Sequence, residues 1–451
     1  MTAPTENLPA SPEQSSVAGR GQRAELEPEA STSGDLQAPL DEIWASSQVD
    51  AEPGEFRVLR PKRAAPADAV RPTRAEINLG HLRHNLHVLS RALEQEGGGR
   101  PRVWGVLKAD AYGHGAPAVA RTLERAGIDG LAVALLEEGL ELRSAGILPI
   151  LVMGGYYGPH HRGLEDALEA ELTPVLYHAE QLERLAGIAR LRDRGPLAFH
   201  LKVDSGMARL GAAPSEVEGL YARIAELPEL RLDGLMSHLA CADAVSREPT
   251  RAQVRRFEGY LERATERRLA PRYRHLANSA GAIAFPEARY DAVRPGLALF
   301  GHSPFFPRGV ELDLRPVMRV KSEIVAMREL HEGDAVGYGH TYVVRGERRI
   351  ATIAMGYADG LSRALSNRGE VLVRGRRAPI AGIVSMDLTA IDVTDVPGAS
   401  VGDEAVVLGA QEGPLGSDAI SAAELADRIG TIPWEVITQI SRRVPRFYRE
   451  P

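Results

Sequence analysis

The sequence predicts an α/β protein in which a (β/α)8 barrel is followed by a mostly antiparallel β domain. Between residues 72 and 312, eight short apolar runs alternate with segments long enough for helices. Over residues 313–451, β-branched runs separated by turn residues dominate, with little helix. Residues 1–71 are rich in Pro, Ala, Ser, Glu and Gly and contain few aliphatic residues, so we expect a disordered tail there.

The barrel prediction rests on apolar runs of strand length. These runs are Trp104–Leu107, Leu131–Ala134, Ile150–Met153, Pro174–Leu176, Phe199–Val203, Gly234–Met236, Arg274–Leu276 and Ala292–Arg294. We also assign to the barrel the segment Arg74–Leu79 and the helical pattern after it. An open, doubly wound sheet is the alternative, but no G-x-G-x-x-G dinucleotide motif follows the first run. We therefore expect the closed barrel.

The C-terminal part contains one clear helical signal among its strands. The segment SAAELADRIG predicts a helix with Ser421 as N-cap, Glu424 completing a capping box and Gly430 at its end. The β-rich runs around this helix predict a second domain rather than a continuation of the barrel.

Composition limits the class of protein. The net charge of -7 argues against non-specific nucleic-acid binding, and residues 1–71 carry most of it, with twelve acidic and seven basic residues. We expect no transmembrane helix and no secretory signal. The single cysteine, Cys241, excludes an internal disulfide framework and a cysteine-based zinc site, and we find no metal-ligand spacing. These observations favour a cytoplasmic protein that binds small molecules, with a tail that is disordered or that docks a partner.

The stretch VWGVLKADAYGHG carries the first chemical signal. Lys108 follows a buried strand and precedes a turn that contains Asp110, Tyr112 and His114. An amine at the rim of an apolar strand has a lowered pKa and can form a Schiff base. The alternative is an ordinary surface lysine. The chain has only four lysines among 54 basic residues, so arginine supplies its general positive charge and a retained lysine points to amine chemistry.

Polar residues follow the later strands of the predicted barrel, where barrel enzymes carry their chemistry. They are Lys202, Asp204, Met207 and Arg209 after the fifth strand, His238 after the sixth, His275, Asn278 and Ser279 after the seventh, and Arg294, Gly296 and Leu297 at the eighth. Each is weak alone, because a strand-end histidine or arginine is commonly structural. Their placement at one rim is the signal.

The last two strands predict a phosphate site. Ser279 and the amides around Gly296 and Leu297 lie where barrel enzymes often bind phosphate, and small residues there let backbone N–H groups approach an anion. An amine at the first strand and a phosphate cradle at the last two fit a planar phosphorylated aldehyde, and pyridoxal phosphate is such a cofactor. Arg294 would point at its ring, and Arg209 at its phenolic oxygen.

The β domain supplies further candidates on turns. GYGHTY contains Tyr338 and Tyr342, MGYADG contains Tyr357, and VSMD contains Met386. A tyrosine near arginine can act as a base, although aromatic residues in such turns are often only packing.

Taken in order, these motifs resemble alanine racemase, a fold-type III pyridoxal-phosphate enzyme. VLKADAYGHG, HLKVDSGMARLG, ANSAG, VRPGLALFG, VGYGHTY, MGYADG and SMD all match the family's pattern, and the resemblance covers roughly residues 74–448. It implies the barrel and β domain predicted above and a homodimer with shared active sites.

The resemblance also implies a role for each residue. Lys108 would bind the cofactor aldehyde and serve as one base, and Tyr338 from the other subunit would serve as the second. The remaining cofactor contacts would come from Tyr112, Arg209, His238, Asn278, Ser279, Arg294, Gly296, Leu297 and Tyr357. Arg209 and Met386 would bind substrate, and Lys202 resembles the lysine that is often carbamylated in this family.

The implied activity is interconversion of L-alanine and D-alanine by two bases, supplying D-alanine for peptidoglycan. Arg442 stands where the family commonly has a tyrosine, which leaves open a racemase for other amino acids such as serine. Ser385 replaces a common cysteine. A non-catalytic pyridoxal-phosphate-binding protein is the remaining alternative, against which the full GYGHTY motif around Tyr338 argues. A decarboxylase of related fold fits less well, because no cysteine occupies the C-terminal loops.

Overall fold

A computed structural model describes residues 70–94, 99–144, 149–154, 156, 163–192, 195–309 and 311–450. The prediction of a disordered tail over residues 1–71 falls outside these residues, except for Val70 and Arg71. Within the described part of the chain, no helix is both long enough and apolar enough to cross a membrane.

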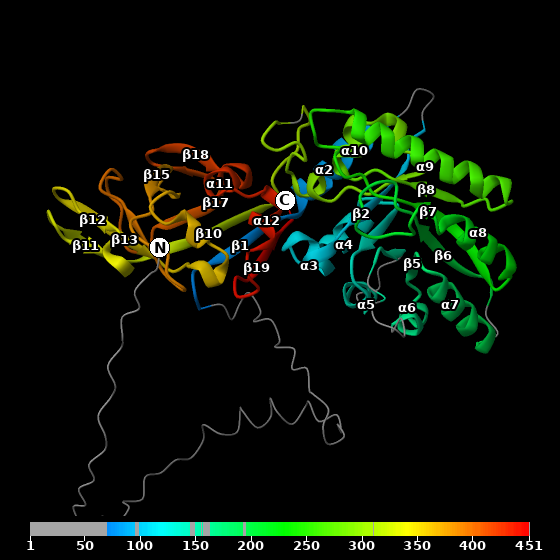
Figure 1. The fold of residues 1–451 in the computed structure, drawn as a ribbon. Helices are drawn as coiled ribbons and strands as arrows, with labels where there is room; N and C mark the ends of the chain where they lie inside the picture. Colours follow the sequence, from blue (N-terminus) through cyan, green and yellow to red (C-terminus); the bar gives the residue numbers. More distant parts are fainter. Residues whose placement is uncertain are drawn as a thin grey trace, which may run out of the picture. The chain divides into compact units, whose positions relative to one another are not determined.

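Eight parallel strands form the predicted barrel (Figure 1). They are β2 (Arg102–Val106), β3 (Gly130–Val133), β4 (Ile150–Val152), β5 (Thr173–Leu176), β6 (Leu197–Lys202), β7 (Leu230–Met236), β8 (Tyr273–His275) and β9 (Ala292–Val293). Strand β2 pairs with both β3 and β9, and the other strands pair in sequence order from β3 to β8. Beside β8 and β9, the Arg294 amide donates to the Ala277 carbonyl at 2.9 Å, which closes the ring. The open-sheet alternative is therefore wrong.

Helices alternate with these strands. They are α2 (Leu79–Ala92), α4 (Ala116–Arg125), α5 (Leu136–Ser144), α6 (Leu164–Glu169), α7 (Ala179–Leu191), α8 (Val217–Glu226), α9 (Glu248–Glu266) and α10 (Ser279–Ala284), with short turns η2 (Pro286–Ala288) and η3 (Leu297–Phe300) around β9. Helix α2 begins where the Asn78 side chain accepts a hydrogen bond from the His81 amide at 3.0 Å. A five-residue segment labelled α3 (Lys108–Tyr112) follows β2 directly.

The C-terminal part is mostly antiparallel sheet, as predicted. Its strands are β10 (Met318–Leu330), β11 (Ala335–Val336), β12 (Tyr342–Val343), β13 (Arg348–Ile353), β14 (Glu370–Val373), β15 (Arg376–Pro379), β16 (Thr389–Asp392), β17 (Glu404–Gly413), β18 (Gly416–Ile420) and β19 (Arg446–Arg449). The short turns η4 (Tyr338–His340), η5 (Tyr357–Asp359) and η6 (Arg363–Leu365) connect strands, and the helices α11 (Ala422–Ile429) and α12 (Pro433–Thr438) precede β19.

The caps of α11 agree with the sequence in part. The Ser421 hydroxyl accepts from the Glu424 amide at 3.0 Å, and Gly430 ends the helix in the left-handed conformation. The reciprocal half of the predicted capping box is not made. The Glu424 carboxylate instead binds the guanidinium groups of Arg377 and Arg428, because ion pairs to two neighbouring arginines replace the contact with the N-cap amide.

The first described strand belongs to the C-terminal sheet. Strand β1 (Arg74–Asn78) pairs antiparallel with β10 and parallel with β19 (Figure 1). The sequence predicts that Arg74–Leu79 belongs to the barrel, because this segment leads into the first barrel helix. The chain instead passes through the sheet before it enters the barrel, and its last strand returns beside the first.

Candidate active site

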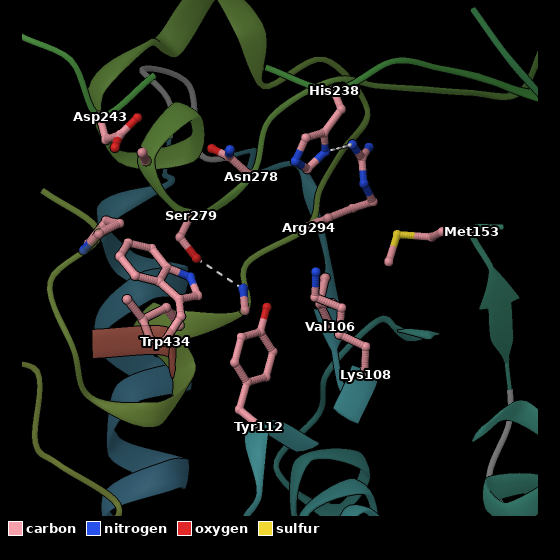
Figure 2. A pocket seen from close by; sticks show the side chains of 14 residues that line it. Val106, Lys108, Tyr112, Met153, His238, Asp243, Asn278, Ser279, Arg294 and Trp434 are labelled. Atoms are coloured by element: carbon pink, nitrogen blue, oxygen red, sulfur yellow. Dashed lines mark hydrogen bonds between the residues drawn. The ribbon is translucent and has the colours of Figure 1, made fainter. Parts of the chain in front are cut away.

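A cavity of about 190 Å³ opens at the carboxyl ends of the barrel strands. Eight residues predicted to bind the cofactor line it (Figure 2), namely Lys108, Tyr112, His238, Asn278, Ser279, Arg294, Gly296 and Leu297. They follow β2, β7 and β8 or lie at β9, so the closed barrel brings together residues that are distant in sequence. The roles predicted for them are proposals that this convergence supports.

Lys108 leads into a backbone turn of unusual hand. Ala109, Asp110, Ala111 and Tyr112 have φ values of 54°, 56°, 53° and 54°, all in the left-handed region. Each non-glycine residue in that region costs roughly 1–2 kcal/mol. Such strain persists only where surrounding contacts hold the backbone, and it is common at functional sites. We call Ala109–Tyr112 the left-handed turn.

The environment of Lys108 favours an amine that loses its proton readily. Partial desolvation lowers the pKa of Lys108, and the nearby charge of Arg209 lowers it further, while Glu138 acts in the opposite direction. The side chain nevertheless remains exposed at the open side of the cavity in the single chain. A lysine with this combination is accessible to an aldehyde and is more nucleophilic than an ordinary surface lysine.

Tyr112, Ser279 and Gly296 form a small polar cradle at one end of the cavity. The Ser279 hydroxyl oxygen accepts from the Gly296 amide at 2.9 Å, which leaves its own proton to donate. The Tyr112 hydroxyl lies so close to Gly296 that a Cβ there would be 2.2 Å from it. Burial raises the pKa of Tyr112, so its hydroxyl keeps its proton. Two hydroxyl donors beside the start of η3 suit an anion.

Arg294 is the largest fully buried side chain of the cavity wall. It donates to the carbonyls of Ser237 at 2.7 Å and His275 at 3.0 Å, and to Nδ1 of His275 at 2.6 Å. Its Nε atom is buried and has no hydrogen-bond partner among the residues that the structure describes. Burial lowers the pKa of Arg294 to about 9, which still leaves a cation at neutral pH. A buried, unsatisfied donor beside a cavity is suited to an acceptor on a ligand.

Two buried histidines, one bonded to Arg294 and the other bonded to the first, support the position of Arg294. Because Nδ1 of His275 accepts from Arg294, the neutral ring carries its proton on Nε2, which donates to Nδ1 of His200 at 2.8 Å. Burial and the charge of Arg294 hold the pKa of His275 well below its usual range, so the ring stays neutral. Gly234 is required beside this pair, since a Cβ there would lie 2.5 Å from the His200 ring.

His238 and Asn278 line the cavity but are engaged by the protein. Nδ1 of His238 lies 3.4 Å from a terminal nitrogen of Arg294, and burial followed by the charge of Arg294 lowers the pKa of His238 well below its usual range. Asn278 caps α10 by accepting from the Gly281 amide at 2.9 Å, and it donates to the Leu239 carbonyl at 3.4 Å. Both contacts of Asn278 are with backbone.

Arg209 and Lys202 lie near this cavity without lining it. Arg209 is exposed, and its charge lowers the pKa of both Lys108 and Lys202. Lys202 is buried. Burial, followed by the charges of Arg294 and Arg209, lowers the pKa of Lys202 to about 8. A substantial fraction of this amine is therefore neutral near pH 8.

Three predicted residues of the β domain lie on exposed turns and do not line the cavity. Tyr338 is 73% exposed, Met386 is 52% exposed and Tyr357 is 41% exposed in the single chain. We call the turns that carry these three residues the sheet loops. The Tyr357 amide donates to the Ser385 carbonyl at 2.9 Å, so two of these turns are joined by backbone. Arg442 is likewise exposed and does not line the cavity.

Sequence reasoning missed several residues of the site. The cavity is also lined by Val106, Met153, Asp243, Ala280, Pro304 and Trp434. Trp434 belongs to α12 in the C-terminal part, and Figure 2 shows it on the side of the cavity where Ser279 and Tyr112 lie. No local pattern identified it, because its neighbours in the cavity come from the barrel. His275 stood at a strand end, but its bond to Arg294 could not be predicted.

The residues present fit pyridoxal phosphate. Lys108 offers an accessible amine for the aldehyde. The unpartnered Nε of Arg294 suits a ring nitrogen acceptor. The cradle at Gly296, which a Cβ would fill, suits the phosphate. These three features lie on the wall of one cavity.

The comparisons with known proteins agree with this site. The family models described as alanine racemase, N-terminal domain, and alanine racemase, C-terminal domain, match residues 77–304 and 317–448. An alanine racemase of Sorangium cellulosum strain So ce56 is 63% identical over 383 residues, which are 85% of this chain and 100% of the relative. A solved alanine racemase of Clostridium difficile 630 has a TM-score of 0.77 at 36% identity, covering 84% of this chain and 96% of that one. The alanine racemase of Bacillus anthracis with bound L-Ala-P has a TM-score of 0.74 at 34% identity, covering 85% and 96%. The chain therefore belongs to the alanine racemase family.

Proposed function

We propose that this protein interconverts L-alanine and D-alanine with pyridoxal phosphate, using Lys108 and Tyr338 as its two bases. When bound, the cofactor withdraws electrons from the substrate and so acidifies the proton on its α-carbon. The observation that carries the proposal is the cavity in which an amine, a phosphate cradle and a buried cation with a free donor face the same space. Family membership and the relatives named above support alanine as the substrate.

The chain's residues divide the work of holding the cofactor. Ser279 and Tyr112 would donate to the phosphate, together with amides at the start of η3. Arg294 would donate through Nε to the ring nitrogen and, as a cation held by neutral His275, would keep that nitrogen unprotonated. An unprotonated ring nitrogen would withdraw electrons less strongly and so disfavour side reactions such as transamination.

Racemisation requires proton transfer on both faces of the α-carbon. Nζ of Lys108 moves a proton on one face, and its lowered pKa favours proton exchange. The hydroxyl of Tyr338 moves a proton on the opposite face. In one chain Tyr338 is exposed on a sheet loop and does not line the cavity, so we propose that it acts in the cavity of a second copy within a homodimer.

The remaining predicted residues orient substrate and cofactor. Arg209 would bind the phenolic oxygen and the substrate carboxylate, for which a guanidinium is well suited. Lys202, whose amine is partly neutral near pH 8, is able to react with carbon dioxide, and the resulting carbamate would hold Arg209. Tyr357 and Met386 of the sheet loops line the partner's substrate entrance. We propose that the enzyme works in the cytoplasm and supplies D-alanine for peptidoglycan.

The deciding experiment is an L-to-D assay of the purified protein with and without added pyridoxal phosphate. We expect D-alanine to form from L-alanine only with the cofactor present, together with a visible absorbance from the lysine-bound cofactor. Serine and other small amino acids form a parallel panel. If another amino acid is racemised faster than alanine, that amino acid is the preferred substrate and alanine is not. Cofactor binding without any racemisation would identify a non-catalytic binding protein and overturn the proposal.

A further inference from the structure

The left-handed turn after Lys108 has backbone hydrogen bonds of its own, among them three of equal length. The Ala111 amide donates to the Leu107 carbonyl, the Gly113 amide to Ala109 and the Gly115 amide to Asp110, each at 2.9 Å. These bonds describe the shape of the turn but do not attach it to the rest of the barrel. Four successive residues in an unfavourable conformation need an external contact that holds them.

Glu138 supplies such a contact from the neighbouring βα unit. Its Oε1 accepts from the Ala109 amide at 2.6 Å, and this amide directly follows Lys108. Its Oε2 accepts from the amides of Ala134 at 2.9 Å and Leu135 at 3.1 Å, which follow β3. One carboxylate at the start of α5 therefore joins the carboxyl ends of β2 and β3, two paired strands of the barrel.

The position of Glu138 separates it from the cofactor site itself. It does not line the cavity, and all of its hydrogen-bond contacts in the described chain are with backbone amides. Its negative charge raises the pKa values of two residues of the cavity wall, Lys108 and Tyr112. Charge-assisted bonds from a carboxylate to backbone amides are stronger than neutral ones, and so suit the task of holding a strained turn.

We propose that Glu138 is a positioning residue, which holds the left-handed turn so that the amine of Lys108 faces the cavity. This inference rests on the proposed function, because the position of Lys108 matters only if that lysine binds the cofactor. Glu138 touches neither cofactor nor substrate. Glu138 acts on Lys108 through the peptide unit that follows Lys108.

The test compares Glu138→Ala and Glu138→Gln with the matched control Glu137→Gln. Glu137 is the exposed neighbour on the same helix, so its change removes the same charge one residue away. Apo protein is titrated with pyridoxal phosphate, and the visible absorbance of the lysine-bound cofactor gives its dissociation constant at a series of pH values. Hydrogen–deuterium exchange of a peptide covering residues 109–115 reports whether the turn is held.

We expect Glu138→Ala to weaken cofactor binding by about tenfold or more, since it removes three charge-assisted bonds. Exchange over residues 109–115 should become faster in the same variant. Glu138→Gln keeps one oxygen acceptor and should bind with intermediate affinity. Because Glu138 opposes the effects of desolvation and of Arg209 on Lys108, its neutral replacement should also let the amine react at lower pH. Glu137→Gln should match the wild type.

Wild-type affinity, exchange and pH dependence in both Glu138 variants would overturn this inference. A wild-type protein that gives no visible absorbance with pyridoxal phosphate would instead overturn the proposed function. If Glu138→Ala does not fold, Glu138→Gln decides alone, because it preserves size and one acceptor. A folded Gln variant whose properties equal those of the Glu137→Gln control contradicts the positioning role.

Discussion

The cofactor cavity and the sheet loops contribute to the same proposed reaction but differ in how completely one chain builds them. Around the cavity, Arg294 and Ser279 are buried and bonded to their neighbours, and the backbone around Lys108 is held in a strained turn. On the sheet loops, Tyr338 and Met386 are more than half exposed. The polar groups of the cofactor cavity are already held by contacts within one chain, whereas the side chains of the sheet loops point into solvent.

This difference indicates which part of the site depends on assembly. A cavity whose polar groups are already oriented can bind a cofactor without large rearrangement. An exposed tyrosine can act as a base only when another surface brings it to a substrate. We therefore expect cofactor binding to depend mainly on the barrel residues in and beside the cavity, and racemisation to depend on both regions.

The largest effect on the racemisation rate should come from two single variants, each of which removes the proposed base of one region. Lys108→Ala should abolish lysine-bound cofactor absorbance, and Tyr338→Phe should retain it, while each lowers racemisation by about 10²–10⁴-fold. Because the two enantiomers have equal free energies, Tyr338→Phe should lower kcat/KM equally in both directions, but it should slow α-proton exchange of one enantiomer more than that of the other. Absorbance spectra, initial rates and α-proton exchange in deuterated water, each from L-alanine and from D-alanine, measure these changes.

Mixing the two variants then tests whether the sites are shared. A mixed dimer contains one site with both bases, so unfolding and refolding an equal mixture should restore about one quarter of the wild-type sites. Each variant refolded alone is the control. If activity stays at the level of the separate variants although mixed dimers form, Tyr338 and Lys108 of the same chain act together, and the comparison fails.

A smaller effect on stability and on KM should come from changing Asp359, a buried residue that supports the sheet loops. Asp359 is fully buried and binds Arg71 at 2.6 Å and the Gly356 amide at 3.0 Å. Asp359→Asn removes a charged partner of Arg71 and should lower the free energy of unfolding by about 1–3 kcal/mol. It should raise KM for alanine more than it lowers kcat, because Tyr357 lies on the same turn.

Urea unfolding and steady-state kinetics measure both quantities for Asp359→Asn. Asp313→Asn, at an exposed position outside the sheet loops that pairs with Arg315 at 3.1 Å, is the matched control and should change little. A lower affinity for the cofactor in Asp359→Asn, with KM unchanged, would contradict the separation of the two regions.

The smallest effect concerns the sheet itself at acid pH. Burial opposes ionisation of Glu404, but hydrogen bonds from Arg319 and Lys321 outweigh it and lower the pKa of Glu404 to about 2. A folded-state pKa below the unfolded value stabilises the protein above about pH 4.5, and this contribution is lost as the pH falls towards 2. After discounting for partial exposure, it is worth about 1–2 kcal/mol.

Glu404→Gln should therefore flatten the pH dependence of stability between pH 4.5 and 2. Thermal unfolding followed by circular dichroism across this range measures the slope, and cofactor absorbance at neutral pH is the control. If the slope of stability against pH is the same in Glu404→Gln and in the wild type, the ion pairs of Glu404 do not contribute to the acid sensitivity of the C-terminal sheet.

Much of the barrel and of the cavity could be predicted from local pattern. Each of the eight strands overlaps the run predicted for it, and in most of them burial on both faces makes the strand apolar along its length. Residues such as Lys108, Ser279 and Arg294 were identified because a barrel gathers the ends of its strands at one rim. Because the carboxyl ends of barrel strands meet at one rim, residues that follow different strands can be predicted to lie close together even when their packing is unknown.

Contacts between distant segments could not be predicted in this way. Strand β1 pairs with β10 and β19 rather than joining the barrel, because hydrogen bonding to two sheet neighbours decides its place. Trp434 reaches the cavity from α12, and Glu138 reaches the turn after Lys108 from α5, with no periodic pattern to indicate either contact.

The sequence by itself determined the order of elements, the family and the chemical types gathered at the rim, since these follow from local composition and short motifs. The tertiary structure alone decided which donor of Arg294 stays free, how the turn after Lys108 is held and which bases face outward. The physical reason is that hydrogen bonding and burial depend on neighbours that are distant in the chain, and only the folded arrangement specifies those neighbours.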